Sequence, residues 1–144
     1  MPRFDPDRIG RLDSEMRKAN GRLTNLRALD KQAFLQDPDK VGSAKYHFIV
    51  SIEAAIDICS HIISKSGYRA PEDYADSFQV LGEQGAFEGD FTKDLKEMAR
   101  FRNRLVHLYW EIDDDQLYEI LQTRLQDFKR FLDHVARFLD LPNS

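Results

Sequence analysis

Apolar residues recur every three or four positions along most of the chain, which is the period of amphipathic helices. The first run follows Asp5-Pro6, a typical helix start because aspartate can cap a helix and proline fits its first turn. We expect this helix to extend to about Leu29, with one apolar stripe on an otherwise charged surface. The stripe consists of Ile9, Leu12, Met16, Leu23 and Leu26.

The densest apolar stretch, residues 41–63, follows a second start signal at Asp37-Pro38. A helix that is apolar on nearly every side is buried on several sides, so this stretch predicts the central helix. Its few polar residues include Glu53, Asp57 and His61, which fall four apart and therefore share one stripe. This stripe faces solvent or an interface, or else Glu53 or Asp57 orients a catalytic group across the bundle.

A connection with two helix breakers, Gly67 and Pro71, is expected at residues 64–73. The apolar spacing that follows predicts a short amphipathic helix, which begins at Tyr74 and stops near Gly82.

Two further helices are expected after residue 89. Asp90 can cap the first, whose three-four apolar repeat continues to Leu108, and a last repeat covers residues 117–139. The run Asp113-Asp114-Asp115 ends one helix or caps the next. No strand alternation, internal repeat or linker is present. We therefore expect one all-α domain, residues 1–144, that is a mostly antiparallel bundle of about five helices and dimerises.

Composition narrows the classes of protein. Hydrophobic residues make up 42% and charged residues 32%, a balance typical of globular domains. We expect no apolar run to span a bilayer, the first residues carry no signal-peptide pattern, and the lone Cys59 cannot form an internal disulfide. A cytoplasmic protein without membrane contact is therefore expected. Because the formal net charge is −4, any RNA contact has to be a local basic patch.

Chemically active side chains are concentrated in the segment Arg-Asn-Arg-Leu-Val-His-Leu-Tyr-Trp, which precedes the aspartate run. Arg102 is always charged, and its planar fork of donors suits phosphate oxygens. His107 can give or accept a proton near neutral pH. Asn103 lies one helical turn before His107 and is placed to orient its imidazole. Arg100 and Arg104 add positive charge nearby.

An arginine and a histidine are sufficient for one class of RNA cleavage that needs no metal ion. His107 would take the proton of the attacking ribose 2′-hydroxyl, and Arg102 would stabilise the charge on the pentacoordinate phosphorus. DNA lacks this hydroxyl and would be spared. Arg102 and Tyr109, seven apart, are expected on one face, whereas Arg102 and His107, five apart, point in different directions. Either the helix distorts near Tyr109, or Arg102 and His107 meet across a dimer interface.

Simpler interpretations stay open. His107 could hydrogen-bond inside the bundle, and Tyr109 and Trp110 could be core or interface aromatics. The chain could also be a non-catalytic dimerising or nucleotide-binding partner of a nucleotidyltransferase, which the acidic net charge favours. A metal-dependent hydrolase is disfavoured, because the four histidines are scattered without a His–Glu pair at metal-ligand spacing, and no cofactor is expected.

The segment from Phe101 to Tyr109, followed by Ile112-Asp113, closely resembles the signature of the HEPN superfamily. More narrowly, it is similar to the HepT-type toxins of HEPN/MNT toxin–antitoxin systems. The resemblance covers almost the whole chain, and the motif itself shows no departure; the charged N-terminal helix is the least diagnostic part. Further agreement lies in the helix containing residues 53–58, the helix from Tyr74 to Gly82 with Phe87, and the C-terminal helix with Phe128 and Phe131.

This resemblance implies a dimer in which the motifs of two chains line one cleft. It implies metal-independent cleavage of cellular RNA by Arg102 and His107. It also implies a partner, a small MNT-type nucleotidyltransferase antitoxin, which can transfer AMP to the motif tyrosine, here Tyr109. The added phosphate would block the site by its bulk and repel RNA by its charge.

Overall fold

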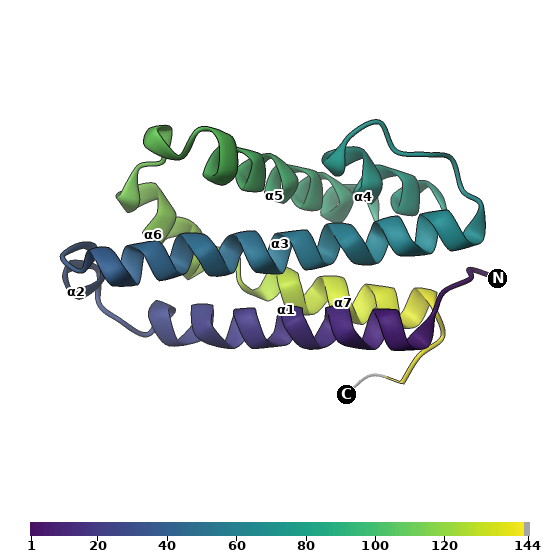
Figure 1. Ribbon diagram of the computed structural model, residues 1–144, viewed down its shortest axis with the longest axis horizontal. Coiled ribbons are helices and arrows are strands. Elements are labelled where there is room, and N and C mark those ends of the chain that lie inside the picture. The colour runs from purple at the N-terminus through teal and green to yellow at the C-terminus, as the bar shows by residue number, and fades with distance from the viewer. Residues whose placement is uncertain (143–144) are drawn as a thin grey trace.

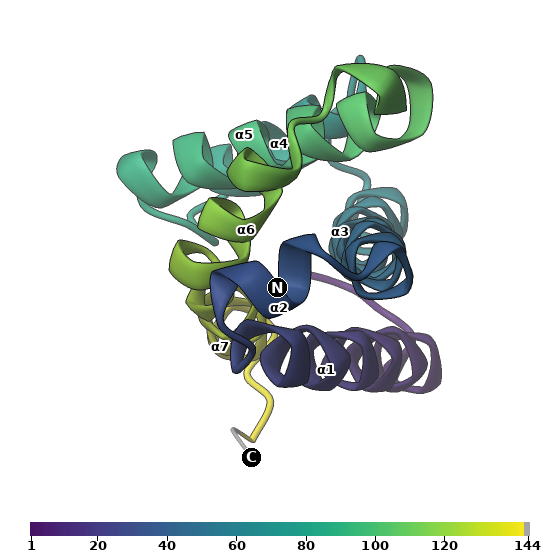
Figure 2. The same cartoon turned by 90° about the vertical axis from the view of Figure 1, so that its left-hand side faces the viewer.

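The computed structural model describes residues 1–142 and is all-helical over that range, as expected. The two longest helices, α1 and α3, run antiparallel along the length of the molecule, and α5 lies on the other side of α3 (Figure 1). Viewed from the end, α6 and α7 complete the bundle opposite α3 (Figure 2). The bounds are α1 (Pro6–Arg27), α2 (Lys31–Leu35), α3 (Pro38–Ser66), α4 (Tyr74–Glu83), α5 (Gly89–His107), the 3-10 helix η1 (Tyr109–Glu111), α6 (Asp114–Thr123) and α7 (Gln126–Phe138).

Helix α3 is the centre of the fold, as its apolar surface predicted. It packs against α1, α2, α4, α5, α6 and α7. By length and composition α3 could also cross a membrane, so the expectation that no apolar run would be long enough was wrong. More than half of its most apolar window is buried inside the fold, which is what the core helix of a bundle requires. Its buried side chains include Phe48, Ile52, Ile56, Ile58, Cys59 and Ile62.

Aspartate side chains begin most of the helices by accepting hydrogen bonds from first-turn N–H groups. The caps predicted at Asp5 and Asp37 are present, and Asp113 caps α6, which settles the role left open for the aspartate run. The cap predicted at Asp90 is wrong. Helix α5 begins one residue earlier, and its N-cap residue is Glu88, which forms no side-chain capping bond.

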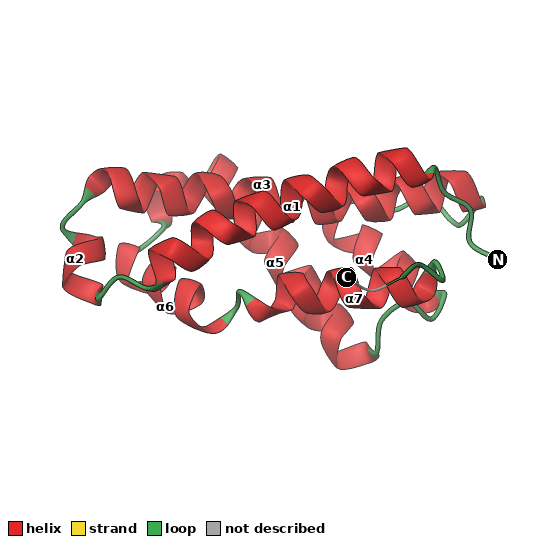
Figure 3. Cartoon of the chain, turned by 90° about the horizontal axis from the view of Figure 1, so that it is seen from below, coloured by secondary structure: helices red, strands yellow, loops and turns green. Residues whose placement is uncertain are grey.

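The described residues contain seven α-helices and not five, because two local features escaped the periodicity. The short α2 forms where the Asp30 carboxylate accepts from the Ala33 N–H, which places Phe34 in the core. The last apolar repeat is split into α6 and α7 at Arg124, where the backbone leaves regular helical geometry. Figure 3 shows this break between α6 and α7 from below. Helix α1 also ends at Arg27, slightly before the predicted Leu29.

Two glycines near helix ends have different roles. Gly67 adopts a left-handed φ of 71° and ends α3, as predicted. Helix α4 ends at Glu83, near Gly82 as predicted. Gly82 also lets α4 approach α5, because a Cβ atom there would lie 2.8 Å from Thr92 Oγ1. The Thr92 hydroxyl donates to the Glu88 carbonyl at 2.9 Å, so this neighbour is held in place.

Gly82→Ala is expected to lower the free energy of unfolding by about 1 kcal/mol, because the clash with Thr92 outweighs the better helix propensity of alanine. Gly42→Ala is the matched control. Gly42 lies inside α3 with nothing within 4 Å of an added Cβ, so the same substitution there should raise stability by up to about 1 kcal/mol. Urea unfolding measures both. Equal stabilisation of the two variants would contradict the close approach.

The connection between α3 and α4 is held by one arginine. Arg69 forms a bidentate pair with Asp76, with Nη1–Oδ2 and Nη2–Oδ1 distances of 2.8 and 2.9 Å, and also bonds Glu83. The guanidinium of Arg69, and then the Glu72 N–H, lower the pKa of Asp76 to about 2. These contacts fix the start of α4, where Tyr74 lies.

Asp76→Asn is expected to destabilise the protein at neutral pH by about 1 kcal/mol. The folded-state pKa of Asp76 lies below its ordinary value of 3.8, so its contribution is present above about pH 4 and is lost as the pH falls towards 2. The unfolding free energies of wild type and variant, measured from pH 7 to pH 2, should therefore converge at the acid end. A difference that stays constant over this range would rule out the charged pair as its cause.

Candidate functional site

The Arg102 side chain is fixed against the central helix by an ion pair. Its Nη2 and Nε atoms both donate to Glu53 Oε1, at 2.6 and 3.1 Å. Only 12% of the Arg102 side chain is exposed, and a guanidinium this far from water needs such a partner. Arg102 lies in α5 and Glu53 in α3, so the site is built on two packed helices rather than on a loop.

The guanidinium of Arg102 makes two further contacts, and part of it stays free. The ring centre of Tyr74, at the start of α4, lies 4.9 Å from Arg102 Cζ, which is a cation–π contact. Nη1 donates to Asn103 Oδ1 at 3.1 Å. Of the five N–H groups of arginine, three are used, and Nη1 and Nη2 keep one each. Arg102 is therefore preorganised with two donors available for an incoming anion.

The polar stripe on α3 divides into separate roles. Glu53 holds Arg102 across the bundle. That Arg102 is the catalytic group in the second interpretation stays a prediction. His61 Nε2 accepts from the Asp5 N–H at 2.8 Å, which ties the start of α1 to α3. Asp57 is exposed on the α1–α3 surface. Asn103 was expected to orient His107, but its side-chain oxygen faces Arg102 instead.

His107 is the last residue of α5 and is exposed. The helix is regular up to this point, because the Leu108 N–H still bonds the Arg104 carbonyl at 2.9 Å. The chain does leave α-helical geometry near Tyr109, as one of the two alternatives expected, because α5 ends at His107 and η1 follows. This change comes after both Arg102 and His107 and does not bring them together. On a regular helix, side chains five residues apart point about 140° from each other, so Arg102 and His107 diverge within one chain.

Tyr109 and Trp110 follow the helix end in η1 and are strongly exposed, at 63% and 66%. Their ring centres are 5.3 Å apart at an angle of 81°. They are therefore not core aromatics of this chain, although an interface role remains compatible with their exposure. The expectation that Tyr109 shares a helix face with Arg102 was wrong, because α5 ends before Tyr109 is reached. The Tyr109 side chain is therefore open to solvent, two residues after His107 in the chain.

Two further arginines on α5 have no partner within the described residues. Within residues 1–142, neither Arg100 nor Arg104 forms a side-chain hydrogen bond or ion pair. The same part of the chain contains no group of three His, Cys, Asp or Glu side chains arranged to hold a metal ion. Chemistry at this site therefore has a guanidinium, an imidazole and further cations available, which suits phosphate substrates.

Sequence reasoning missed Tyr74 as part of the site. It was used only as the first apolar residue of a short helix, and its spacing gives no sign that it covers Arg102. The signal that pointed to Glu53 was its place among very few polar residues on a buried helix. Tyr74 is identified only by the packing of α4 on α5.

Known proteins resemble this chain in sequence and structure. It is 32% identical over 104 residues to the mRNA nuclease HepT of Shewanella oneidensis, covering 72% of this chain and 78% of the relative. It is 30% identical over 87 residues to the tRNA nuclease HepT of Aphanizomenon flos-aquae, covering 60% and 59%. A solved structure of a tri-AMPylated Shewanella oneidensis HEPN toxin in complex with an MNT antitoxin is 27% identical, with a TM-score of 0.85 and coverage of 92% and 99%. The family described as "Ribonuclease HepT-like" matches residues 16–135, and the chain belongs to this family.

Proposed function

We propose that this protein is the toxin of a type VII HEPN/MNT toxin–antitoxin pair, a metal-independent endoribonuclease that acts on cellular RNA in the cytoplasm. The observation that carries this proposal is the state of Arg102. Its guanidinium is fixed by Glu53 and Tyr74 and keeps two free donors, as a group that stabilises developing phosphate charge requires. Membership of a ribonuclease family supports the same chemistry.

In the proposed reaction, His107 takes the proton of a ribose 2′-hydroxyl, and the oxygen attacks the adjacent phosphorus. The bond to the 5′ oxygen of the next nucleotide breaks, and that oxygen takes a proton from water, which leaves a 2′,3′-cyclic phosphate and a 5′-hydroxyl end. Arg102 binds the charged phosphoryl oxygens of the transition state. Because Arg102 and His107 diverge within one chain, the active cleft is proposed to form between two copies, each contributing one of the two groups.

The partner is proposed to be an MNT-type nucleotidyltransferase antitoxin that transfers AMP to Tyr109. The exposure of Tyr109 and its place two residues after His107 support this control. An AMP group there would bring bulk and negative charge to the position where the RNA phosphate binds. The solved relative, described as tri-AMPylated and bound to an MNT antitoxin, is consistent with the proposal.

The catalytic roles are tested with purified protein and total cellular RNA in the presence of chelator. His107→Ala should reduce cleavage by about 10²–10⁴-fold, the range typical of general acid–base catalysis. Arg102→Lys keeps the charge but loses the planar fork, and should reduce cleavage by at least about 10²-fold. His61→Gln, on the other side of α3, is the control and should cleave normally.

Three results would contradict this assignment. Full activity of both variants would favour the non-catalytic helical partner considered above. Loss of activity in chelator, restored by a divalent cation, would contradict metal independence. Cleavage products with a 3′-hydroxyl and a 5′-phosphate end would exclude attack by the ribose oxygen.

The control by modification is tested by intact-mass measurement of the protein produced with and without the adjacent nucleotidyltransferase gene. Co-production should add one or more AMP units, mapped by peptide analysis to Tyr109, and should abolish RNA cleavage. Tyr109→Phe should stay unmodified and active. An unmodified, yet inhibited, wild-type protein would indicate that the antitoxin acts by binding alone.

A further inference from the structure

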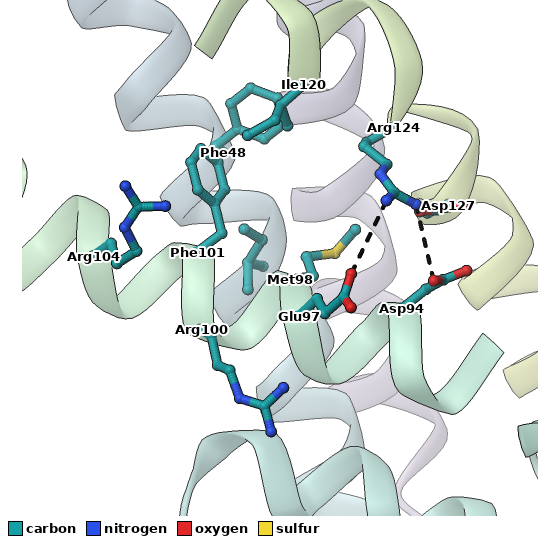
Figure 4. A pocket seen from close by; sticks show the side chains of 11 residues that line it. Phe48, Asp94, Glu97, Met98, Arg100, Phe101, Arg104, Ile120, Arg124 and Asp127 are labelled. Atoms are coloured by element: carbon teal, nitrogen blue, oxygen red, sulfur yellow. Dashed lines mark ion pairs between the residues drawn. The ribbon is translucent and has the colours of Figure 1, made fainter. Parts of the chain in front are cut away.

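An apolar cavity of about 250 Å³ lies in a seam of the bundle, away from the Arg102 contacts. Helix α5 packs on α3 and α4, whereas α6 and α7 pack on α1 and α3, so α3 forms the floor between them. The lining side chains come from these elements, and Phe48, Met98 and Phe101 lie between them (Figure 4). The apolar part of the lining consists of Phe48, Ile52, Met98, Phe101 and Ile120.

One end of this seam is lined by Arg124 and three carboxylates. Arg124 lies 3.9 Å from Asp94, 4.0 Å from Glu97 and 3.8 Å from Asp127, so it bridges α5 and the start of α7. These separations exceed hydrogen-bond distance, and the carboxylates of Asp94 and Glu97 are partly exposed. Their oxygens therefore keep the capacity to accept hydrogen bonds from a ligand.

The other end of the seam is basic. Arg100 and Arg104 extend from α5 on the side of the cavity away from Arg124 (Figure 4). Residues 100, 104 and 107 are spaced by four and three, so both arginines share one face of α5 with His107. Four residues of helix rise by about 6 Å, so the two cations and the imidazole form a track along the helix axis.

We propose that this seam is a nucleotide subsite for the RNA strand beside the cleaved bond. Arg100 and Arg104 bind its phosphates, and the apolar cavity takes one unstacked base. This inference rests on the ribonuclease function proposed above. Proteins that bind single-stranded RNA combine cations along the backbone with apolar or aromatic surfaces for the bases. An apolar cavity next to unpaired arginines offers both.

The carboxylates beside Arg124 give the subsite a base preference. Asp94 and Glu97 accept hydrogen bonds from the amino groups of adenine, cytosine or guanine. Uracil has no amino group, and its one N–H lies between two carbonyl oxygens, which carboxylates repel. Adenine, cytosine or guanine is therefore favoured over uracil at this position.

The test measures binding of short single-stranded RNA oligonucleotides by fluorescence anisotropy, in a His107→Ala background that prevents cleavage. R100Q/R104Q should weaken binding about tenfold at moderate salt. It should also reduce the slope of log K against log salt by about 0.7 for each phosphate that the variant no longer binds. K18Q/R22Q removes the same formal charge from exposed positions on α1 and should leave both quantities unchanged.

The base preference has its own variants. Oligoadenylate and oligocytidylate should bind more tightly than oligouridylate. Met98→Trp, which fills the cavity, should abolish this difference while leaving the salt slope intact. Glu97→Gln, at the exposed rim, should reduce the difference without altering the core, so a folding defect in Met98→Trp does not decide the outcome.

Several results would overturn the subsite and leave the proposed ribonuclease untouched. R100Q/R104Q that binds RNA like its parent would show that the arginines contact no phosphate. Equally weakened binding in R100Q/R104Q and K18Q/R22Q would indicate a general charge effect. If R100Q/R104Q becomes monomeric or loses only the antitoxin, the seam is a protein interface. By contrast, wild-type protein that cleaves no RNA, yet binds it at the seam, would overturn the proposed function alone.

Discussion

Helix α3 carries apolar side chains on nearly all sides, and covering that surface decides where the other helices lie. Helices α1, α5 and the α6–α7 pair each bury one part of it, and α4 covers its C-terminal part. The part of α3 that its neighbours leave uncovered carries polar side chains, such as the exposed Asp57 and the partly exposed Glu53. Glu53 occupies such a position beside α5, and this places a carboxylate where Arg102 needs one.

The Arg102–Glu53 pair converts that packing into a chemical site. A guanidinium that is mostly removed from water gains from a fixed acceptor, and the pair leaves it little freedom to move. Tyr74 adds a third helix to the arrangement, because α4 is held close to α5 through Gly82 and to its preceding loop through Arg69. The same contacts therefore stabilise the packing of α3, α4 and α5 and hold Arg102 in its orientation.

Helix α5 presents different chemistry on its two sides. Arg102 faces the protein, where its neighbours are fixed, whereas His107 and Arg100 are exposed and Arg104 is half-buried. Within residues 1–142 neither Arg100 nor Arg104 has an ion-pair partner. A substrate phosphate that meets both sides needs either a second chain or a path around the helix end. This division gives the physical reason for proposing a shared cleft, and it separates the cations that act on the reacting phosphate from those proposed to hold the flanking strand.

The sequence by itself determined the all-α class, the central helix, the caps at Asp5 and Asp37, and the segment that carries Arg102, His107 and Tyr109. These follow from local spacing and local chemistry, which a linear pattern records. Only the tertiary structure decided that Asn103 and Glu53 serve Arg102, that Tyr74 covers it, and that α5 ends at His107. It also revealed the seam beside Arg104, which depends on how α5 and α6 diverge over α3. Contacts between residues far apart in the chain depend on helix packing, and a periodic pattern does not encode which faces meet.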